Sequence, residues 1–495
     1  MNALLIFLNR RVNLKLFPGI PVVQRFLLPL LVLLFSTLVI YAQTAPVVFG
    51  LDAFIDVVTN NHPVMAKAEL LRSRAESSVL EARGSFDPKI DMEYSNKSFD
   101  GKNYYQIYQG ALKIPTWFGI DLKTSYSHNR GEYINEMDFL PSSGLWDLGL
   151  SLPLGKGLLL DERRAQLKKA QLYVQSAEQE RILIINDLLR DALDSYLQWQ
   201  QAYQFLRVAE DGVALAEQRL EGAVSGFLQG DKPAVDTLES FLSMQDRMQT
   251  LFKARQIFSN TRVSLSNFIW MNGQIPMELD SMAIPDLLDD DILAGFYSES
   301  LMREDALLEQ HPSIAQYLLK MDQLDIEIRL SQEALKPDLR LDYFPLVSGE
   351  TQLLQRLTTN NYKFGATLNY PILQRKARGK LRINEIKSQE LIYDLSLKRR
   401  ELDIKLDLYR QNIENQELQF ALANEMVENY QRLLDAEYRK FSVGESSVFL
   451  VNSREVSYLE SRKKRIETLV NLTKYRLAYI YWGASLIDLL SESTN

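Results

Sequence analysis

Two long stretches without proline constrain the fold of this chain more than any other feature. Residues 161–227 and 375–441 contain neither a proline nor a clear stop signal. At 1.5 Å per residue each would form a helix about 100 Å long, whereas helices of globular proteins commonly span about 11–12 residues. Helices of this length predict a rod or a tube rather than a compact globule.

Apolar residues recur every seven positions along both stretches, which is the period of a coiled-coil seam. The first stretch has Ala192, Trp199, Leu206, Val213, Leu220 and Phe227, and the positions 214 residues later hold Leu406, Ile413, Phe420, Val427, Leu434 and Phe441. A second stripe in the first stretch is mostly small, with Ala202, Ala209, Ala216 and Ala223. A helix with more than one seam has more than one helical neighbour, although stripes alone are also compatible with an ordinary soluble bundle.

The chain contains two copies of one pattern. Each copy begins with a His-Pro pair at a helix start, and Pro63 and Pro312 are 249 positions apart. Each long stretch ends in Phe-x-x-Gly, formed by Phe227 and Gly230 and, 214 positions later, by Phe441 and Gly444. Glycine adopts the left-handed conformation that closes a helix. We therefore predict the tips of two helical hairpins at 226–236 and 440–451.

Between the His-Pro helix and the long helix, each copy changes to an alternating pattern that is typical of strands. We expect strands within about 86–154 in the first copy and within about 337–371 in the second. Tyrosines and phenylalanines along these segments fit a membrane barrel with aromatic girdles, and a soluble hairpin packed on a helix is the alternative. The first copy is longer, and its surplus, 104–114 and 119–129, contains either an extra hairpin or an external excursion.

The N-terminus and the composition indicate an exported protein. Basic residues precede the apolar run 26–40, and Ala42 follows at a plausible cleavage point, so 1–42 reads as a signal peptide. A membrane anchor is the alternative, but the run is short of the roughly 20 residues that span a bilayer. The chain has no cysteine, which excludes disulfides, thiolate metal sites and a cysteine-linked lipid anchor. Its net charge of −8 does not suit nucleic acid.

The sequence predicts no catalytic, metal or cofactor site. Of its three histidines, His62 and His311 precede prolines at equivalent helix starts, and we interpret them as helix-entry residues rather than as a metal pair. No nucleophile, base and orienting group can be matched. The glycines at 155 and 157 lack the pattern of a phosphate loop. We therefore expect a protein that is not an enzyme.

The order of these elements resembles the TolC-like outer-membrane efflux proteins over nearly the whole mature chain. The resemblance implies a mostly α fold with a β-barrel portion, built from two tandem repeats of a β hairpin and a long coiled-coil helical hairpin. It implies a homotrimeric tube with a shared barrel, usually with four strands per protomer. We place the first repeat at 43–273, a connecting region at 274–309 and the second repeat at 310–495.

The resemblance also implies a function and its partners. The protein would be the passive outer-membrane duct, with a periplasmic helical extension, of a tripartite efflux or type I secretion system that exports small molecules or proteins. An inner-membrane pump and a periplasmic adaptor would be its partners. The adaptor would contact the tips, where we single out Gly226, Phe227, Gly230, Phe441 and Gly444.

Some family members narrow the periplasmic entrance with aspartates near a tip. Here the first tip offers Asp231 and Asp236, and the second has Glu445 but no aspartate. These carboxylates are candidates for a pore constriction, and compensation of a helix dipole is the alternative. A secreted or periplasmic coiled-coil scaffold without channel activity is the alternative function.

Overall fold

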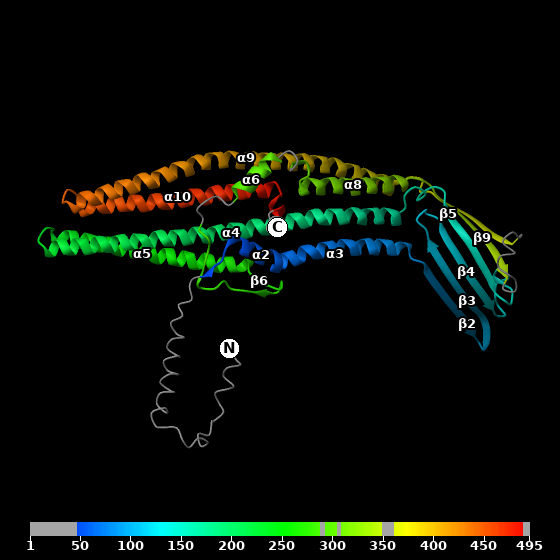
Figure 1. The fold of residues 1–495 in the computed structure, drawn as a ribbon. Coiled ribbons are helices and arrows are strands. Elements are labelled where there is room, and N and C mark those ends of the chain that lie inside the picture. Colours follow the sequence, from blue (N-terminus) through cyan, green and yellow to red (C-terminus); the bar gives the residue numbers. More distant parts are fainter. Residues whose placement is uncertain (1–46, 288–292, 304–307, 349–360, 489–495) are drawn as a thin grey trace, which may run out of the picture. The chain divides into compact units, whose positions relative to one another are not determined.

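The computed structural model describes residues 47–287, 293–303, 308–348 and 361–488 (Figure 1). The predicted signal peptide at 1–42 lies outside these residues. Parts of the predicted connecting region at 274–309 also lie outside them.

The described residues divide into two units. The smaller one contains Val47–Phe49 and Asp280–Ile284. In it, strand β1 (Val47–Val48) pairs in parallel with strand β8 (Ala283–Ile284). All other described residues belong to the larger unit, to which the following paragraphs refer.

The larger unit combines long helices with a six-stranded sheet and a small two-stranded sheet formed by β6 and β7. Its helices are α2 (Leu51–Asn61), α3 (Pro63–Arg83), α4 (Glu162–Leu228), α5 (Ala234–Leu265), α6 (Ala294–Met302), α8 (Pro312–Glu333), α9 (Arg375–Ser442) and α10 (Val448–Trp482). Its strands are β2 (Lys89–Phe99), β3 (Lys102–Pro115), β4 (Asp121–Arg130), β5 (Leu145–Pro153), β6 (Trp270–Met271), β7 (Ile275–Pro276), β9 (Asp338–Ser348) and β10 (Tyr362–Asn369).

Helices α4 and α9 confirm the two long helices expected from the absence of proline. They contain 67 and 68 residues, so each is about 100 Å long. The Asp161 side chain caps α4 by accepting a hydrogen bond of 2.9 Å from the backbone N–H of Arg164. Among the described residues, no helix is both long enough and apolar enough to cross a membrane.

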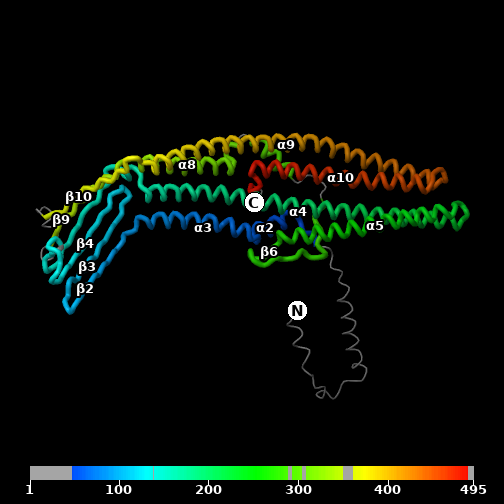
Figure 2. Tube along the Cα trace, turned by 180° about the vertical axis from the view of Figure 1, so that it is seen from behind, coloured from blue at the N-terminus to red at the C-terminus, as the bar shows by residue number. Residues whose placement is uncertain are grey.

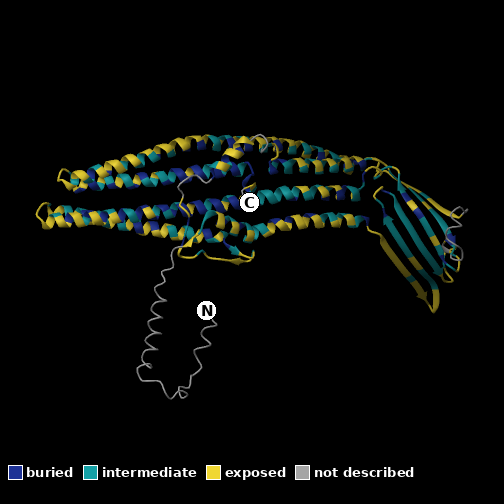
Figure 3. Ribbon diagram, in the orientation of Figure 1, coloured by how far each residue is buried: buried dark blue, intermediate teal, exposed yellow. Residues whose placement is uncertain are grey.

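The predicted seams are where the helices pack. Helix α4 contacts α3 and α5 on one side and α8 and α10 on the other, and α9 packs against α8 and α10. The stripe of small residues on α4 is buried, from Ala202 through Ala209 and Ala216 to Ala223. Leu206 and Val213 pack with Leu251 of α5. Figure 3 shows buried residues along α4 and α10, the helices with the most neighbours. Figure 2, the view from behind, shows that the helices run alongside one another.

Both predicted helix-entry histidines are N-caps. The Nδ1 atom of His62 accepts a hydrogen bond of 3.2 Å from Val64, and that of His311 accepts one of 3.1 Å from Ser313. A cap of this kind needs an unprotonated Nδ1. Burial lowers the pKa of His62, and burial together with nearby Lys398 lowers the pKa of His311 to about 4. Both rings therefore stay neutral and keep their caps at neutral pH.

Six strands form one antiparallel sheet in the order β10-β9-β5-β4-β3-β2. Within it, β5 of the first copy pairs with β9 of the second. The second copy contributes one hairpin, as predicted. The first copy contributes four strands, because its surplus forms an extra pair of strands, β3 and β4, which is one of the two possibilities that the sequence leaves open. The described sheet therefore has six strands instead of the four per protomer that the resemblance implies.

The sheet has one apolar face and one polar face, because side chains alternate along each strand and cross-strand partners share a face. The cross-strand register places the following large side chains, all of them exposed, on the apolar face: Ile90, Met92, Tyr94, Tyr108, Trp146, Leu150, Tyr343, Tyr362, Phe364 and Leu368. The other face carries the following polar residues: Asp91, Glu93, Lys97, Lys113, Lys123, Ser125, Asp147, Arg340, Asp342, Lys363 and Thr367.

Candidate functional site

The first candidate site is the end of the unit where the two helical hairpins turn. At the α4–α5 turn, Gly230 has φ of +80°. Its N–H donates to the carbonyl of Phe227 at 3.0 Å, and the N–H of Asp231 donates to the carbonyl of Gly226 at 2.9 Å. These two bonds make a Schellman motif, which satisfies the last carbonyls of the helix. Pro233 then occupies the N-cap position of α5, without a side-chain hydrogen bond to the helix.

The α9–α10 turn repeats this arrangement. Gly444 has φ of +82°, and its N–H donates to Phe441 at 3.2 Å, while the N–H of Glu445 donates to Lys440 at 2.9 Å. The Ser447 hydroxyl then caps α10 by accepting from Leu450. The structure thus brings both predicted Phe-x-x-Gly motifs to turns with the same geometry.

The two tips contact each other within one protomer. The Nζ of Lys232 lies 3.4 Å from the centroid of the Phe441 ring, which is a close cation–π contact. Gly226 allows this position, because a Cβ there would meet the stem of Lys232 at 3.0 Å. Burial lowers the pKa of Lys232. Lys232 lies within the predicted tip at 226–236, but its contact with Phe441 could not be predicted, because nothing in the sequence places it beside a phenylalanine of the other copy.

The tips expose a cluster of apolar side chains to solvent. This apolar tip surface consists of Val224, Phe227, Leu228, Val235, Leu238, Val443, Phe449 and Leu450, each at least 40% exposed. Monomeric soluble proteins rarely expose contiguous apolar patches of this kind, and such patches mark sites of interaction.

The three candidate constriction residues lie at the tips. Asp231 and Glu445 are exposed and follow the turn glycines directly. Asp236 is half-buried in the first turn of α5, a position where a carboxylate also stabilises the positive end of the helix dipole.

A buried polar network lies behind the tips and takes residues from all four long helices. Arg219 of α4 pairs with Glu455 of α10, and each side chain is 1% exposed. The hydroxyl of Tyr438 on α9 donates to Glu455 at 2.6 Å. On the other side, Arg219 donates to Ser243 of α5 at 2.6 Å, and Ser243 donates to Asn452 at 3.0 Å. We call these five residues the four-helix network.

The four-helix network fixes how the two hairpins sit against each other. Arg219 is nine residues from the end of α4, which places the network about 13 Å behind the tip. Burial lowers the pKa of Arg219 and raises that of Tyr438. No sequence motif points to these residues. The available signal is their spacing: Arg219 lies three positions from Ala216 of the small-residue stripe, and Glu455 lies four positions from the apolar Leu459, so each falls on a helix face with an apolar neighbour.

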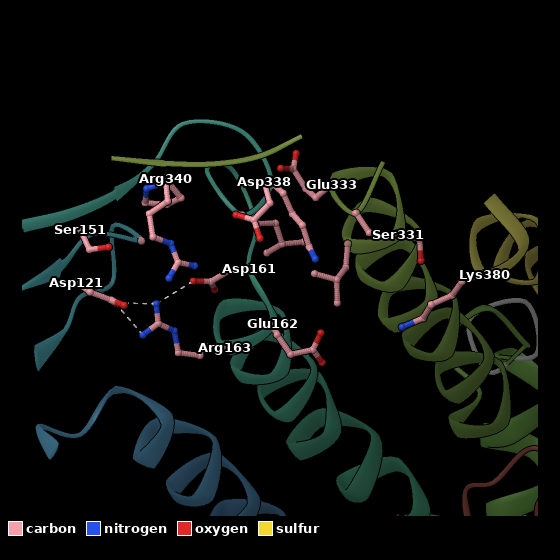
Figure 4. A pocket seen from close by; sticks show the side chains of 17 residues that line it. Asp121, Ser151, Asp161, Glu162, Arg163, Ser331, Glu333, Asp338, Arg340 and Lys380 are labelled. Atoms are coloured by element: carbon pink, nitrogen blue, oxygen red, sulfur yellow. Dashed lines mark hydrogen bonds and ion pairs between the residues drawn. The ribbon is translucent and has the colours of Figure 1, made fainter. Parts of the chain in front are cut away.

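A second candidate site is a pocket of about 410 Å³ where the sheet meets the helices (Figure 4). The guanidinium of Arg163, at the start of α4, donates twice to Asp121 of β4 at 3.0 Å and also contacts Asp161. Figure 4 shows Arg340 of β9 pointing into the same pocket. These contacts join the extra strands to the first turn of α4. In the part of the chain that the structure describes, no cluster of three metal-binding side chains was found.

The four-helix network yields a prediction about stability. Glu455→Leu leaves the Arg219 charge buried without its partner, which typically costs about 3–5 kcal/mol. Combining it with Arg219→Met removes both charges and should restore most of the lost unfolding free energy. Glu460→Leu is the matched control, because Glu460 is exposed, lies on the same helix and pairs with Lys463, and such pairs contribute about 0–1 kcal/mol.

Urea unfolding of the purified protein, followed by tryptophan fluorescence, measures these differences. Equal losses for Glu455→Leu and Glu460→Leu would show that the buried pair does not hold the helices together.

Comparisons with known proteins agree on the fold. The structure of the CmeC outer membrane channel of Campylobacter jejuni superposes with a TM-score of 0.61 at 13% identity, covering 89% of this chain and 88% of that one. The structure of VceC, an outer membrane protein of Vibrio cholerae, superposes with a TM-score of 0.61 at 11% identity, covering 87% of this chain and 95% of that one. The structure of the open MtrE outer membrane channel of Neisseria gonorrhoeae superposes with a TM-score of 0.59 at 13% identity, covering 88% of both chains.

No protein-family model matches the chain, and no curated protein sequence matches it. The sequence identities to the solved structures are low, so these comparisons show the fold alone. The resemblance inferred from the order of elements is confirmed at this level: this chain has the fold of the outer-membrane channels of the TolC-like type.

Proposed function

We propose that this chain is one subunit of a homotrimeric, passive channel in the outer membrane. The observation that carries the proposal is the apolar face of the six-stranded sheet, joined directly to helices about 100 Å long. A water-soluble protein would cover such a face, whereas a bilayer solvates it. The helices would then extend through the periplasm as a tube.

The edges of the protomer support assembly with sister copies. Within the described residues, the sheet ends in β2 and β10, each with one unpaired edge. Helix α9, which continues from β10, also exposes a long apolar stripe, formed by Ile383, Ile386, Tyr393, Leu397, Ile404, Leu408, Leu418 and Leu422. On the opposite flank, α5 exposes Leu242, Phe252, Ile257 and Val263. A neighbouring copy on each flank would cover both exposed apolar surfaces.

The four-helix network would hold the periplasmic end of the channel in one state. Because its residues come from α4, α5, α9 and α10, the two hairpins cannot move apart while the network is intact. Opening would require the helices to shift about their seams and these bonds to exchange.

The apolar tip surface supports a proposal about the partners of the channel. A periplasmic adaptor would bind the apolar tip surface, and an inner-membrane pump would deliver the cargo and supply the energy, in an efflux or type I secretion system. The channel would need no cofactor and would perform no catalysis. Asp231, Asp236 and Glu445 would line the narrow entrance. The coiled-coil scaffold remains the alternative function, and the exposed apolar sheet face argues against it.

Cell fractionation tests the proposed function. We expect the protein in the outer-membrane fraction, extracted by detergent, with the mass of a trimer in light scattering. Recovery from the periplasm as a soluble monomer would favour the scaffold instead.

Charge reversal at the entrance tests the constriction. Asp236→Lys should shift the ion preference of single channels in planar bilayers toward anions, because it replaces a negative charge at a narrow point. Asp246→Lys, the same change on the same helix about 15 Å farther from the tip, is the control and should have a smaller effect. Unchanged conductance and ion preference for Asp236→Lys would remove this residue from the constriction.

A change of backbone conformation tests the adaptor contact. Gly444→Val cannot adopt the left-handed conformation without strain and should distort the second tip, so that export in a drug-sensitised strain falls. Gly222→Val is the matched control, because Gly222 lies within α4 and a Cβ added there would meet no other atom. Export that survives Gly444→Val as well as it survives Gly222→Val would contradict a role of this tip in docking.

A further inference from the structure

The extra strands β3 and β4 extend from the helices to the far end of the sheet. β3 has 14 residues and β4 has 10, comparable to β2 and β5 on either side. They are paired over most of their lengths with each other and with both neighbours. The first copy therefore runs up and down four times as a continuous meander, rather than as a hairpin with an excursion.

The turn between β3 and β4 is fixed to the helical end of the sheet. The Trp117 ring in this turn stacks on Phe86, at the end of the segment that leaves α3, with 4.4 Å between ring centroids. Asp121, the first residue of β4, pairs with Lys113 at 3.2 Å and with Arg163 of α4 at 3.0 Å. The turn is thus built into the junction shown in Figure 4.

The two faces of the sheet continue through the extra strands. Tyr108 of β3 contacts Tyr94 of β2, with 4.7 Å between their ring centroids, and Tyr126 of β4 contacts Trp146 of β5 at 4.9 Å. All four rings lie on the apolar face. On the polar face, Ser125 of β4 donates to Asp147 of β5 at 2.6 Å. The extra strands therefore have the same lipid-facing and lumen-facing pattern as the others.

The free edges of the sheet are complementary in direction. All neighbouring strands are antiparallel, and there are six of them, so β2 and β10 run in opposite directions. A copy rotated about a common axis would bring its β2 beside β10 in an antiparallel orientation. An unpaired strand edge is not tolerated in the hydrocarbon of a membrane, so both edges require a partner.

We propose that the partner of each edge is a second copy of this chain, and that β2 of one protomer pairs with β10 of the next to close an eighteen-stranded barrel. This proposal rests on the proposed trimeric channel and specifies its membrane part. It differs from the four strands per protomer that the resemblance implies, which would give twelve.

The additional strands set the width of the pore in the membrane. With strands about 4.8 Å apart and tilted by about 40°, twelve strands close at a radius of about 12 Å and eighteen at about 18 Å. Barrels of 16–18 strands enclose an aqueous channel. The opening at the outer surface would therefore be wider than in a twelve-stranded relative, and large cargo would meet its main restriction at the helical tips.

Disulfide cross-linking tests the closure, and the natural chain offers a background without cysteine. Met92→Cys on β2 is combined in turn with Tyr362→Cys, Phe364→Cys and Ala366→Cys on β10, all on the apolar face. Oxidation of outer membranes should convert at least one pair to covalent dimers and trimers on non-reducing gels, since facing Cβ atoms on paired strands lie about 4.5–5.5 Å apart.

The matched control moves the first cysteine to an inner strand. Tyr126 of β4 lies level with Met92, because both pair with Gly110. In an eighteen-stranded barrel it is three strands away from the neighbouring β10, or about 14 Å, so Tyr126→Cys with the same three partners should give no cross-link.

The outcomes separate this inference from the proposed function. Cross-links through Tyr126→Cys in place of Met92→Cys would show that the barrel closes at β4 with four strands, which overturns the inference and leaves the trimeric channel intact. Membrane trimers that cross-link at neither position would also overturn it. Soluble monomers without cross-links would overturn the channel itself.

Discussion

The constraint on which the structure depends is that one protomer cannot satisfy its own edges. In the part of the chain that the structure describes, the backbone N–H and C=O groups along the outer sides of β2 and β10 have no strand beside them. The neighbouring helices carry apolar stripes on the same flanks. In water an unpaired edge promotes association, and in lipid it is forbidden. In the proposed trimer, a further copy on each side would cover the edges of the sheet and of the helices alike. A closed ring is the arrangement that leaves no edge.

The interior of the protomer is arranged to keep the two hairpins in register over their length. Small side chains on α4 let its neighbours approach closely, and apolar clusters join α4 to α5 and to α10. Near the tips this apolar packing gives way to the four-helix network around Arg219 and Glu455. A buried ion pair contributes little net stability, but it disfavours any arrangement that separates its partners. Such a contact would suit the periplasmic end of the proposed channel, which would be shut in one state and open in another.

Much of the fold could be predicted from the sequence because its signals are local. The absence of proline gives the length of α4 and α9, the seven-residue period gives their buried faces, and Gly230 and Gly444 mark the turns. The signals that failed concern partners distant in sequence. The surplus of the first copy showed alternation, but alternation does not say which strand pairs with which, and the contacts that place it, such as Arg163 with Asp121, join separate elements. Arg219 and Glu455 are 236 positions apart, so their pairing is invisible in either helix alone.

On the function proposed above, this chain encloses a hollow conduit only together with sister copies. Electron cryo-microscopy of the detergent-purified particle would reveal such a conduit. We expect a threefold-symmetric tube with a central lumen that runs from the barrel into the helical part and narrows at the tips. A compact monomer, or an oligomer without a lumen, would contradict it.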